Sequence, residues 1–394
     1  MDFQTHITHQ LNEQLAVEEL VAKLSTTNLV SLVCYFTQNY GADKLRKAFK
    51  HALPNVSIIG CSTCKGVMTE KGVHFGSVLS VLAIYDSGSD AYGSALMTFD
   101  TQSESVEATQ KAIEVALAKA NREGEVPRFA IVHSTPGMEE TLIKSIDSVF
   151  QTPVPLIGAT AADNAIKGQW SVFTEDGATN KGLAIQLVFA SKPLSTGFSC
   201  GYSPTECMGT ITKASGRELL EIDNRPAQDV YLDWIFQHSG TRVSEQFKFE
   251  LVTRYPLGRV AGELYEQPYF KLSHPVSATD SRGILLFTDI EVGEKVTLMS
   301  GDKEQLIARP ARVIKEAKRQ AIEHSQLSGA VCVICAGAML YLDDDIEKVY
   351  AMIKQEMGEL PFICPFTFGE QGRFINGNNG HGNLMISSAA FYSD

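Results

Sequence analysis

The sequence lacks any stretch that would cross a membrane or direct the chain into one. Residues 1–14 have no basic start followed by an apolar segment, which a secretory signal requires. The longest apolar run, residues 329–342, is shorter than the roughly 20 residues of a membrane-spanning helix. This run ends at consecutive aspartates, and we expect it to form a buried strand and a turn. We therefore expect a cytoplasmic protein with no membrane partner.

Positive charge is also scarce. The 394 residues include 34 lysines and arginines against 46 aspartates and glutamates, which gives a formal net charge of -12. Proteins that bind duplex nucleic acid need clustered basic side chains to contact phosphates, and no such run is present, so we expect no nucleic-acid partner. With 44% hydrophobic and 20% charged residues, the chain has the composition of an ordinary folded protein with room for two domains.

Familiar catalytic motifs are absent as well. The sequence has no G-x-S-x-G elbow, no P-loop, no G-x-G-x-x-G after a strand and no H-E-x-x-H. Cys61 and Cys64 form a C-x-x-C, which suits a redox pair or half of a zinc site, but no second pair suited to structural zinc accompanies it. Reduced cysteines are the simpler expectation in the cytosol. We predict that the chain is not an enzyme, and an enzyme that uses Cys61 is the weaker alternative.

What the sequence does contain is one pattern that occurs three times. An apolar strand leads to an amphipathic helix, then to a second short strand, and then to further strand segments. The first strands are expected at residues 29–36, 129–133 and 331–335, and the helices near residues 42–52, 138–150 and 345–357. The pattern predicts an α+β fold with mixed, largely antiparallel sheets that are flanked by helices and built from repeated strand–helix–strand units.

We expect two sheet-containing domains after an N-terminal helical segment at residues 1–28. The first domain would span residues 29–200 and the second residues 201–394, because prolines and glycines interrupt the pattern near residues 191–204. The second domain holds a segment with no counterpart in the first half. In this segment we expect a helix at residues 227–237, a strand at 247–254 and a long helix at 303–324.

Two glycine-containing segments are the first candidates for a binding site. A glycine after an apolar strand lets the backbone turn with its N–H groups exposed, which suits oxygens and anions. A tight exit from a strand would explain each segment equally well when it is taken alone. Two similar segments in one chain favour a shared cleft. They comprise Gly60, Cys61, Ser62 and Thr63 in the first and Gly158 and Ala159 in the second.

Histidine and arginine supply the other candidates. His381 lies among small polar residues, where we expect a loop that lets the imidazole reach a ligand or metal, although asparagine–glycine runs are also ordinary turn chemistry. His133 ends a buried strand, and His74 and His274 are weaker candidates. Arg254 ends an expected strand and could hold a carboxylate, and a surface ion pair explains it equally well.

In their order along the chain, several segments resemble the FIST sensory domains. The resemblance rests on residues 58–63 with Gly66, residues 157–159 with Asp163, Gly369 and Glu370 with His381 and Asn383, residues 249–252 and 255–258, and Cys335 with Gly337. It covers about residues 29–391 as an N-terminal and a C-terminal part. It implies an intracellular sensor that binds a small ligand and acts in signal transduction, with Gly369 and Asn383 among the ligand-binding residues.

A stand-alone branch of that family, the nitric-oxide sensor NosP, is of similar length. Resemblance to this branch implies haem as a cofactor, nitric oxide as the signal and a histidine kinase as the partner. It would make His381 the metal ligand and Arg254 the partner of a haem propionate. In this sequence Gly382 separates the histidine from Asn383, whereas the family pattern has the asparagine directly after it. The alternative is a FIST sensor of a small metabolite such as an amino acid, without haem. A homo-oligomer is left open.

Overall fold

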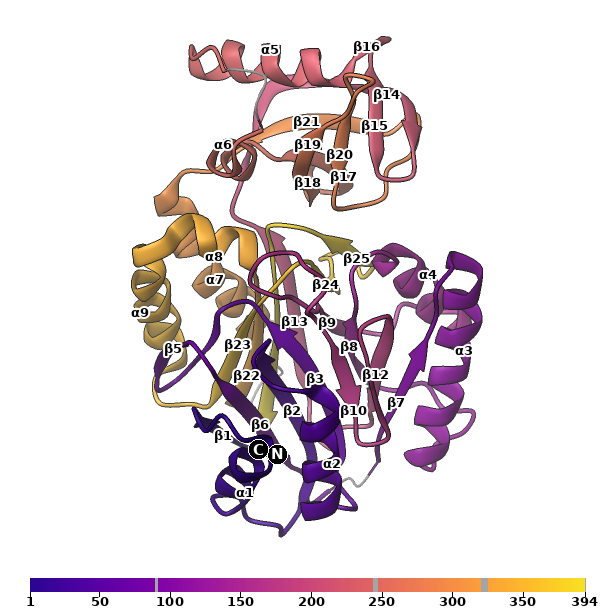
Figure 1. The fold of residues 1–394 in the computed structure, drawn as a ribbon, viewed down its shortest axis with the longest axis vertical. Helices are drawn as coiled ribbons and strands as arrows, with labels where there is room; N and C mark the ends of the chain where they lie inside the picture. The colour runs from indigo at the N-terminus through magenta and orange to yellow at the C-terminus, as the bar shows by residue number, and fades with distance from the viewer. Residues whose placement is uncertain (89–90, 244–246, 320–324, 394) are drawn as a thin grey trace.

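The structure is a computed structural model that describes residues 1–88, 91–243, 247–319 and 325–393. These residues form three six-stranded sheets and one eight-stranded sheet. The three six-stranded sheets make a base from residues 1–200 and 303–393, and the eight-stranded sheet makes an upper unit from residues 203–300 (Figure 1). The chain leaves the base after β13 (Leu194–Cys200) and returns to it at α7 (Lys303–Lys318). The α+β prediction is confirmed.

The base contains the predicted threefold pattern. In each six-stranded sheet, two parallel strands are connected through a helix. The three units are β2 (Leu29–Thr37), α2 (Ala42–Ala52) and β3 (Ser57–Thr63); β8 (Phe129–Ser134), α4 (Glu139–Phe150) and β9 (Leu156–Thr160); and β22 (Gln326–Cys335), α8 (Ala336–Leu342), η1 (Asp343–Asp345), α9 (Ile346–Met357) and β23 (Phe362–Thr367). The strand that pairs antiparallel with each first strand is β6 (Leu79–Tyr85), β12 (Gly182–Val188) or β26 (Met385–Ser393).

The three sheets of the base pack around one shared core. Along β2, Val33 and Tyr35 face this core, whereas Cys34 between them faces the opposite way, as the twofold periodicity of a strand requires. Ile131, Ile157 and Val331 bring the other two sheets into the same core. Each fully buried side chain of this size contributes about 1.5–3 kcal/mol. The outer faces are covered by α1 (Glu13–Val21) with α2, by α3 (Gln102–Lys119) with α4, and by α7 with α8 and α9.

Each repeat gives a hairpin to another sheet. The hairpin after β3 pairs with β23, the hairpin after β9 pairs with β3, and the hairpin after β23 pairs with β9. These hairpins are β4 (Gly66–Thr69) with β5 (Gly72–Phe75), β10 (Val172–Thr174) with β11 (Gly177–Thr179), and β24 (Glu370–Arg373) with β25 (Asn379–Gly382). The exchanges close a ring, so no repeat can separate without the loss of a backbone ladder.

The upper unit is an antiparallel sheet with the strand order β18-β17-β21-β14-β15-β20-β19, and β16 pairs with β15. Its strands are β14 (Ser203–Ser215), β15 (Glu218–Ile222), β16 (Arg225–Pro226), β17 (Leu257–Leu264), β18 (Gln267–Ser273), β19 (Pro275–Ala278), β20 (Ile284–Leu286) and β21 (Lys295–Ser300). Helix α5 (Ala227–Ser239) packs on this sheet through Tyr231 and Ile235. The short helix α6 (Phe249–Arg254) contacts α8 of the base (Figure 1).

Several local predictions are wrong. Residues 1–28 contain a strand, β1 (Asp2–Thr8), before α1, because β1 pairs with β6 at the sheet edge. The predicted strand at residues 247–254 is wrong, because residues 249–254 form the helix α6. Phe249 and Val252 are three positions apart, which suits one face of a helix, and Pro256 comes two residues after the helix ends. The apolar run at 329–342 continues into α8 after its strand.

The long helix α7 ends at Lys318, whereas the prediction extended it to residue 324. Residues 320–324 lie outside the described residues. Residues 201–394 also do not form one unit in space, because the third repeat shares the core of the base with the other two. No helix in the described part of the chain is both long and apolar enough to cross a membrane.

Candidate functional site

A cavity of about 300 Å³ lies where the upper unit meets the base, and we call it the interface pocket. Its lining from the base follows directly on strand ends: Cys64 after β3, residues 163–166 after β9, Phe368 after β23, and Cys335, Ala336, Gly337 and Leu340 at the junction of β22 and α8. The upper unit contributes Phe247, Phe249, Val252, His274, Pro275, Val276 and Phe287. Ligand sites of α/β sheets commonly form at the carboxyl ends of parallel strands, as here.

Aromatic and aliphatic side chains dominate the walls of the interface pocket. The ring of His274 lies between two of them, with its centre 6.2 Å from that of Phe249 and 5.8 Å from that of Phe287. A pocket of this kind favours a mainly apolar ligand with few polar contacts.

His274 is a polar side chain of the pocket that can form one more hydrogen bond. Its Nε2 lies 3.2 Å from Oγ1 of Thr253, and its Nδ1 has no hydrogen-bond partner among the described residues. Burial lowers the pKa of His274 to about 4, so the ring is neutral at pH 7. A neutral imidazole can exchange one hydrogen bond with a ligand, or it can bind a metal.

Asp163 fixes the shape of the loop at the pocket rim. Burial alone would raise the pKa of its carboxyl group, but backbone N–H groups donate to both oxygens and lower the pKa overall. The donors belong to Ala165, Ile166, Lys167 and Gln169. Asp163 is therefore an ionised anchor of the loop, and its oxygens are already occupied.

Asn383 and Glu370 lie behind the pocket wall. Nδ2 of Asn383 donates to the carbonyl of Phe368 at 3.0 Å, and its Oδ1 accepts from the backbone N–H of His274 at 3.4 Å. Asn383 thereby connects two walls of the pocket. Glu370 is fully buried, and this burial raises the pKa of its carboxyl group well above the usual range. It has no cationic partner among the described residues, so its surroundings favour the neutral form of the carboxyl group.

The two glycine segments are strands, so the predicted turns are wrong. Gly60 lies within β3 and Gly158 within β9. A Cβ atom at Gly60 would lie 2.2 Å from the ring of Phe173, and one at Gly158 would lie 2.1 Å from the side chain of Gln371. Both neighbours stand on hairpins received from another repeat, and each glycine leaves room for one of them. That Gly60 and Gly158 take part in ligand binding stays a prediction.

The other residues of these segments are buried as well. Ser62, Thr63 and Ala159 lie in the base, and the chain enters the interface pocket only after them. Cys61 faces the central core, whereas Cys64 lies at the pocket. Burial raises the pKa of the Cys61 thiol well above its ordinary value, which leaves it unreactive. All eight cysteines are free.

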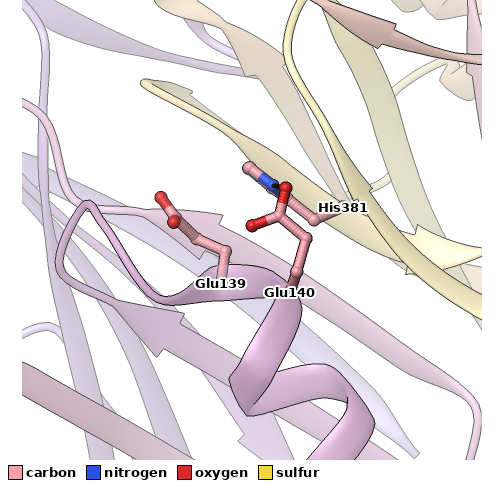
Figure 2. Close-up of side chains that lie close together, drawn as sticks. All are labelled: Glu139, Glu140 and His381. Atoms are coloured by element: carbon pink, nitrogen blue, oxygen red, sulfur yellow. Dashed lines mark hydrogen bonds and ion pairs between the residues drawn. The ribbon is translucent and has the colours of Figure 1, made fainter. Parts of the chain in front are cut away.

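His381 belongs to a second contact between the upper unit and the base. It lies in β25, where a loop was predicted, and its buried Nδ1 is 3.1 Å from Oε1 of Glu140 (Figure 2). Glu139 and Glu140 begin α4. Arg217, in the turn between β14 and β15, lies 2.7 Å from Glu139 and 3.2 Å from Glu140. We call these four residues the latch.

The charges of the latch stabilise one another. Burial alone would lower the pKa of His381, but the carboxylates of Glu140 and Glu139 outweigh it and raise the pKa. Burial alone would raise the pKa of Glu140, but His381 and Arg217 hold it well below its usual range. Asp289 of the upper unit completes the contact, because its backbone N–H donates to Glu140 at 3.0 Å and its carboxylate pairs with Arg217 at 2.9 Å.

The latch does not fit a haem ligand or a metal centre. Nε2 of His381 has no hydrogen-bond partner among the described residues, but it packs against Gly369, where an added Cβ atom would lie 2.3 Å away. Iron would have no space there. Ligand-type atoms of Glu139, Glu140 and His381 lie within 4.8 Å of one another, yet Arg217 already supplies the positive charge between the carboxylates.

The remaining candidates lie outside the interface pocket. Arg254 is exposed on the upper unit, with its guanidinium 5.3 Å from the ring centre of Tyr255. His133 is buried in the core, where its Nε2 lies 3.2 Å from the hydroxyl of Tyr35 and burial lowers its pKa to about 3. His74 lies in β5, away from the pocket lining.

Comparison with known families gives two matches that together cover most of the chain. The FIST N domain model matches residues 31–225, and the FIST C domain model matches residues 227–373. The chain belongs to the FIST family. FIST domains generally sense small ligands. In this FIST chain the two matches meet at β16, so both domains contribute strands to the upper unit.

The FIST chain is also similar to an uncharacterized protein of Methanocaldococcus jannaschii. The two are 22% identical over an alignment of 284 residues, and the match covers 68% of this chain and 51% of the relative. The chain thus spans about half the length of this curated relative.

Some residues of the FIST chain became candidates only through the structure. In the latch, Arg217 contacts Glu139 across 78 positions of the sequence, and His381 contacts Glu140 across 241 positions. No local sequence pattern predicts contacts over such separations. Two acids at the start of a helix, Glu139 and Glu140, are ordinary dipole partners in sequence. His274 ranked low because nothing in the sequence places Phe249 and Phe287 against it.

Proposed function

We propose that this FIST chain senses a small, mainly apolar ligand in the interface pocket and signals through the position of the upper unit on the base. The observation that carries the proposal is that both units supply the walls of one apolar pocket. A ligand held between two bodies favours the relative position in which both contact it, and it shifts the equilibrium by its difference in affinity.

The latch gives this proposal a second contact between the same two bodies. Helices α6 and α8 lie on one side of the junction, and α4 and β25 lie on the other (Figure 1). With Arg217 held by Glu139 and Glu140 on the latch side, a ligand on the α6 side would tilt the upper unit about the latch.

The first candidate ligand is a small, mainly apolar metabolite. A free amino acid fits this class less well, because its carboxylate would find no arginine or lysine among the described residues that line the pocket. A volume of about 300 Å³ is at the lower end of ligand pockets, which span about 300–1,000 Å³. The neutral ring of His274 would supply the polar contact, with Nδ1 toward the ligand. Apolar contact with Phe249 and Phe287 would supply most of the binding free energy.

Haem is the second candidate, and the observation that favours it is the imidazole of His274 with its unpartnered Nδ1. Haem fits less well, because a haem carries two carboxylates and no arginine or lysine is among the described residues that line the pocket. If haem is the ligand, we propose nitric oxide as the signal and a histidine kinase as the partner. His274, in place of His381, would then hold the iron.

A thermal-shift experiment with haemin and a panel of apolar amino acids and small aromatic metabolites tests the proposal. We expect one class to raise the Tm, because a ligand at 100 times its Kd adds about 2.7 kcal/mol to the free energy of unfolding. His274→Ala should reduce that rise, and His381→Ala should leave it unchanged. If haemin acts, its absorption spectrum should change in the same variant. Stabilisation that depends on His381 and not on His274 would contradict the assignment of the pocket.

A further inference from the structure

A second cavity, of about 870 Å³, lies between α5 and α6 of the upper unit, and Tyr341 of α8 in the base also lines it. We call it the basic groove. Its apolar lining consists of Ile235, Val243, Leu251, Tyr255 and Tyr341. Three strong bases, Arg242, Lys248 and Arg254, share this lining with a single acid, Glu250, among the described residues.

The three bases are exposed, and none makes an ion pair within the described part of the chain. Aromatic rings hold two of them in place: Arg254 lies 5.3 Å from the ring centre of Tyr255, and Arg242 lies 5.1 Å from that of Phe236. The chain has a net charge of -12, so three cations without an ion pair to any described residue at one cavity form a local charge opposite to the overall one. Complementary charge steers partners and favours those of opposite sign.

Helix α6 separates the basic groove from the interface pocket. Its residues Phe249 and Val252 line the pocket, and Glu250, Leu251 and Arg254 line the groove. At 3.6 residues per turn, the six residues of α6 place these two sets on different sides of one short helix. A ligand that displaces α6 from the pocket side would therefore move Arg254 in the groove.

We propose that the basic groove docks an acidic segment of the signalling partner. Carboxylates of such a segment would meet Arg242, Lys248 and Arg254, and its apolar side chains would contact Leu251 and Tyr255. The position behind α6 would make this docking sensitive to the pocket, and that link alone rests on the proposed function.

Fluorescence anisotropy with a short labelled peptide rich in glutamate and leucine tests the docking. We expect binding that weakens with added salt and that Arg254→Glu weakens at least about tenfold, because a favourable charge pair becomes a repulsive one. Lys248→Glu should act in the same direction. The matched control is Arg312→Glu, at an exposed arginine of α7 that does not line the groove, and it should leave the affinity unchanged.

Equal affinity in Arg254→Glu and Arg312→Glu would overturn the proposal. Displacement of the peptide by millimolar inorganic phosphate would also overturn it, in favour of a small anion as the occupant. Self-association that Arg254→Glu abolishes would assign the groove to a second copy of this chain. If the interface pocket does not bind a ligand, the peptide should still bind to the basic groove. If the groove does not bind an acidic segment, the ligand should still raise the Tm. Failure of the proposed function and failure of the docking proposal are therefore distinguishable.

Discussion

Glu140→Gln is expected to lower the free energy of unfolding by about 2–3 kcal/mol at pH 7. The substitution keeps the shape of the side chain but removes the charge that His381 and Arg217 share. Loss of one partner of a fully buried pair costs about 3–5 kcal/mol, and partial exposure of Glu140 and Arg217 reduces this figure. Urea unfolding of the wild type and the variant measures the difference.

The same variant should change the dependence of stability on pH. The pKa of His381 in the folded protein is above its ordinary value of about 6.5. The stability that His381 contributes is therefore complete below about pH 6.5 and is lost as the pH rises through the folded pKa. Wild-type stability should fall over that interval, and Glu140→Gln should flatten the fall. An unchanged slope would mean that His381 is not held protonated by Glu140.

Glu370→Gln is the matched control for the latch variant. It makes the same substitution at a carboxyl group that is more deeply buried, but burial favours the neutral form of Glu370 and no described cation depends on it. Its amide can keep the hydrogen bonds to the Met385 N–H and to the Thr367 hydroxyl. We expect a change within about 1 kcal/mol. A loss as large as that of Glu140→Gln would show that burial, and not charge, decides both results.

Leu340→Trp is expected to weaken ligand binding at least about a hundredfold, or about 2.7 kcal/mol. Leu340 is half-buried on α8 and lines the interface pocket, so an indole at this position would occupy much of its 300 Å³. Because the side chain extends into a cavity, the free energy of unfolding should change by no more than about 1 kcal/mol. Calorimetric titration with the most stabilising compound of the thermal-shift panel measures the affinity.

The control for this variant is Leu264→Trp, the same substitution at an exposed position at the end of β17, outside the pocket lining. It should bind the ligand as the wild type does. Equal weakening in both variants would indicate a general effect of the added indole and would remove the pocket from the account.

Local sequence patterns predict the repeated units of the base well. Strand and helix positions in each repeat follow from apolar periodicity, and the predicted strand–helix–strand units are present. In each of them the structure pairs the two strands in parallel, as β2–β3, β8–β9 and β22–β23. The exchange of hairpins between sheets is a long-range arrangement, and no periodicity reports it. Gly60 and Gly158 therefore look like turn residues in sequence, although they make room for Phe173 and Gln371 of other repeats.

The site was predictable only in part. The pocket lining includes Cys64, Asp163 and Phe368, which come after β3, β9 and β23, and Asn383 lies behind it. The predicted residues 60–63, 158 and 159 do not line this pocket. The prediction of a loop at His381 is wrong. Its small polar neighbours are typical of a loop, but β25 pairs with β24 and the side chain is buried. The histidine that lines the pocket is His274 of the upper unit. The strands of this unit do not belong to the repeated pattern, so the pattern could not predict their position.

Hydrogen–deuterium exchange with and without the most stabilising compound tests the central claim most directly, because backbone amides report where a ligand orders the chain. The account predicts slower exchange in the loop at residues 163–169, in α6 and at the junction of β18 and β19, which together enclose the interface pocket. Protection confined to other parts of the base, with these three segments unchanged, would contradict a ligand held between the two units.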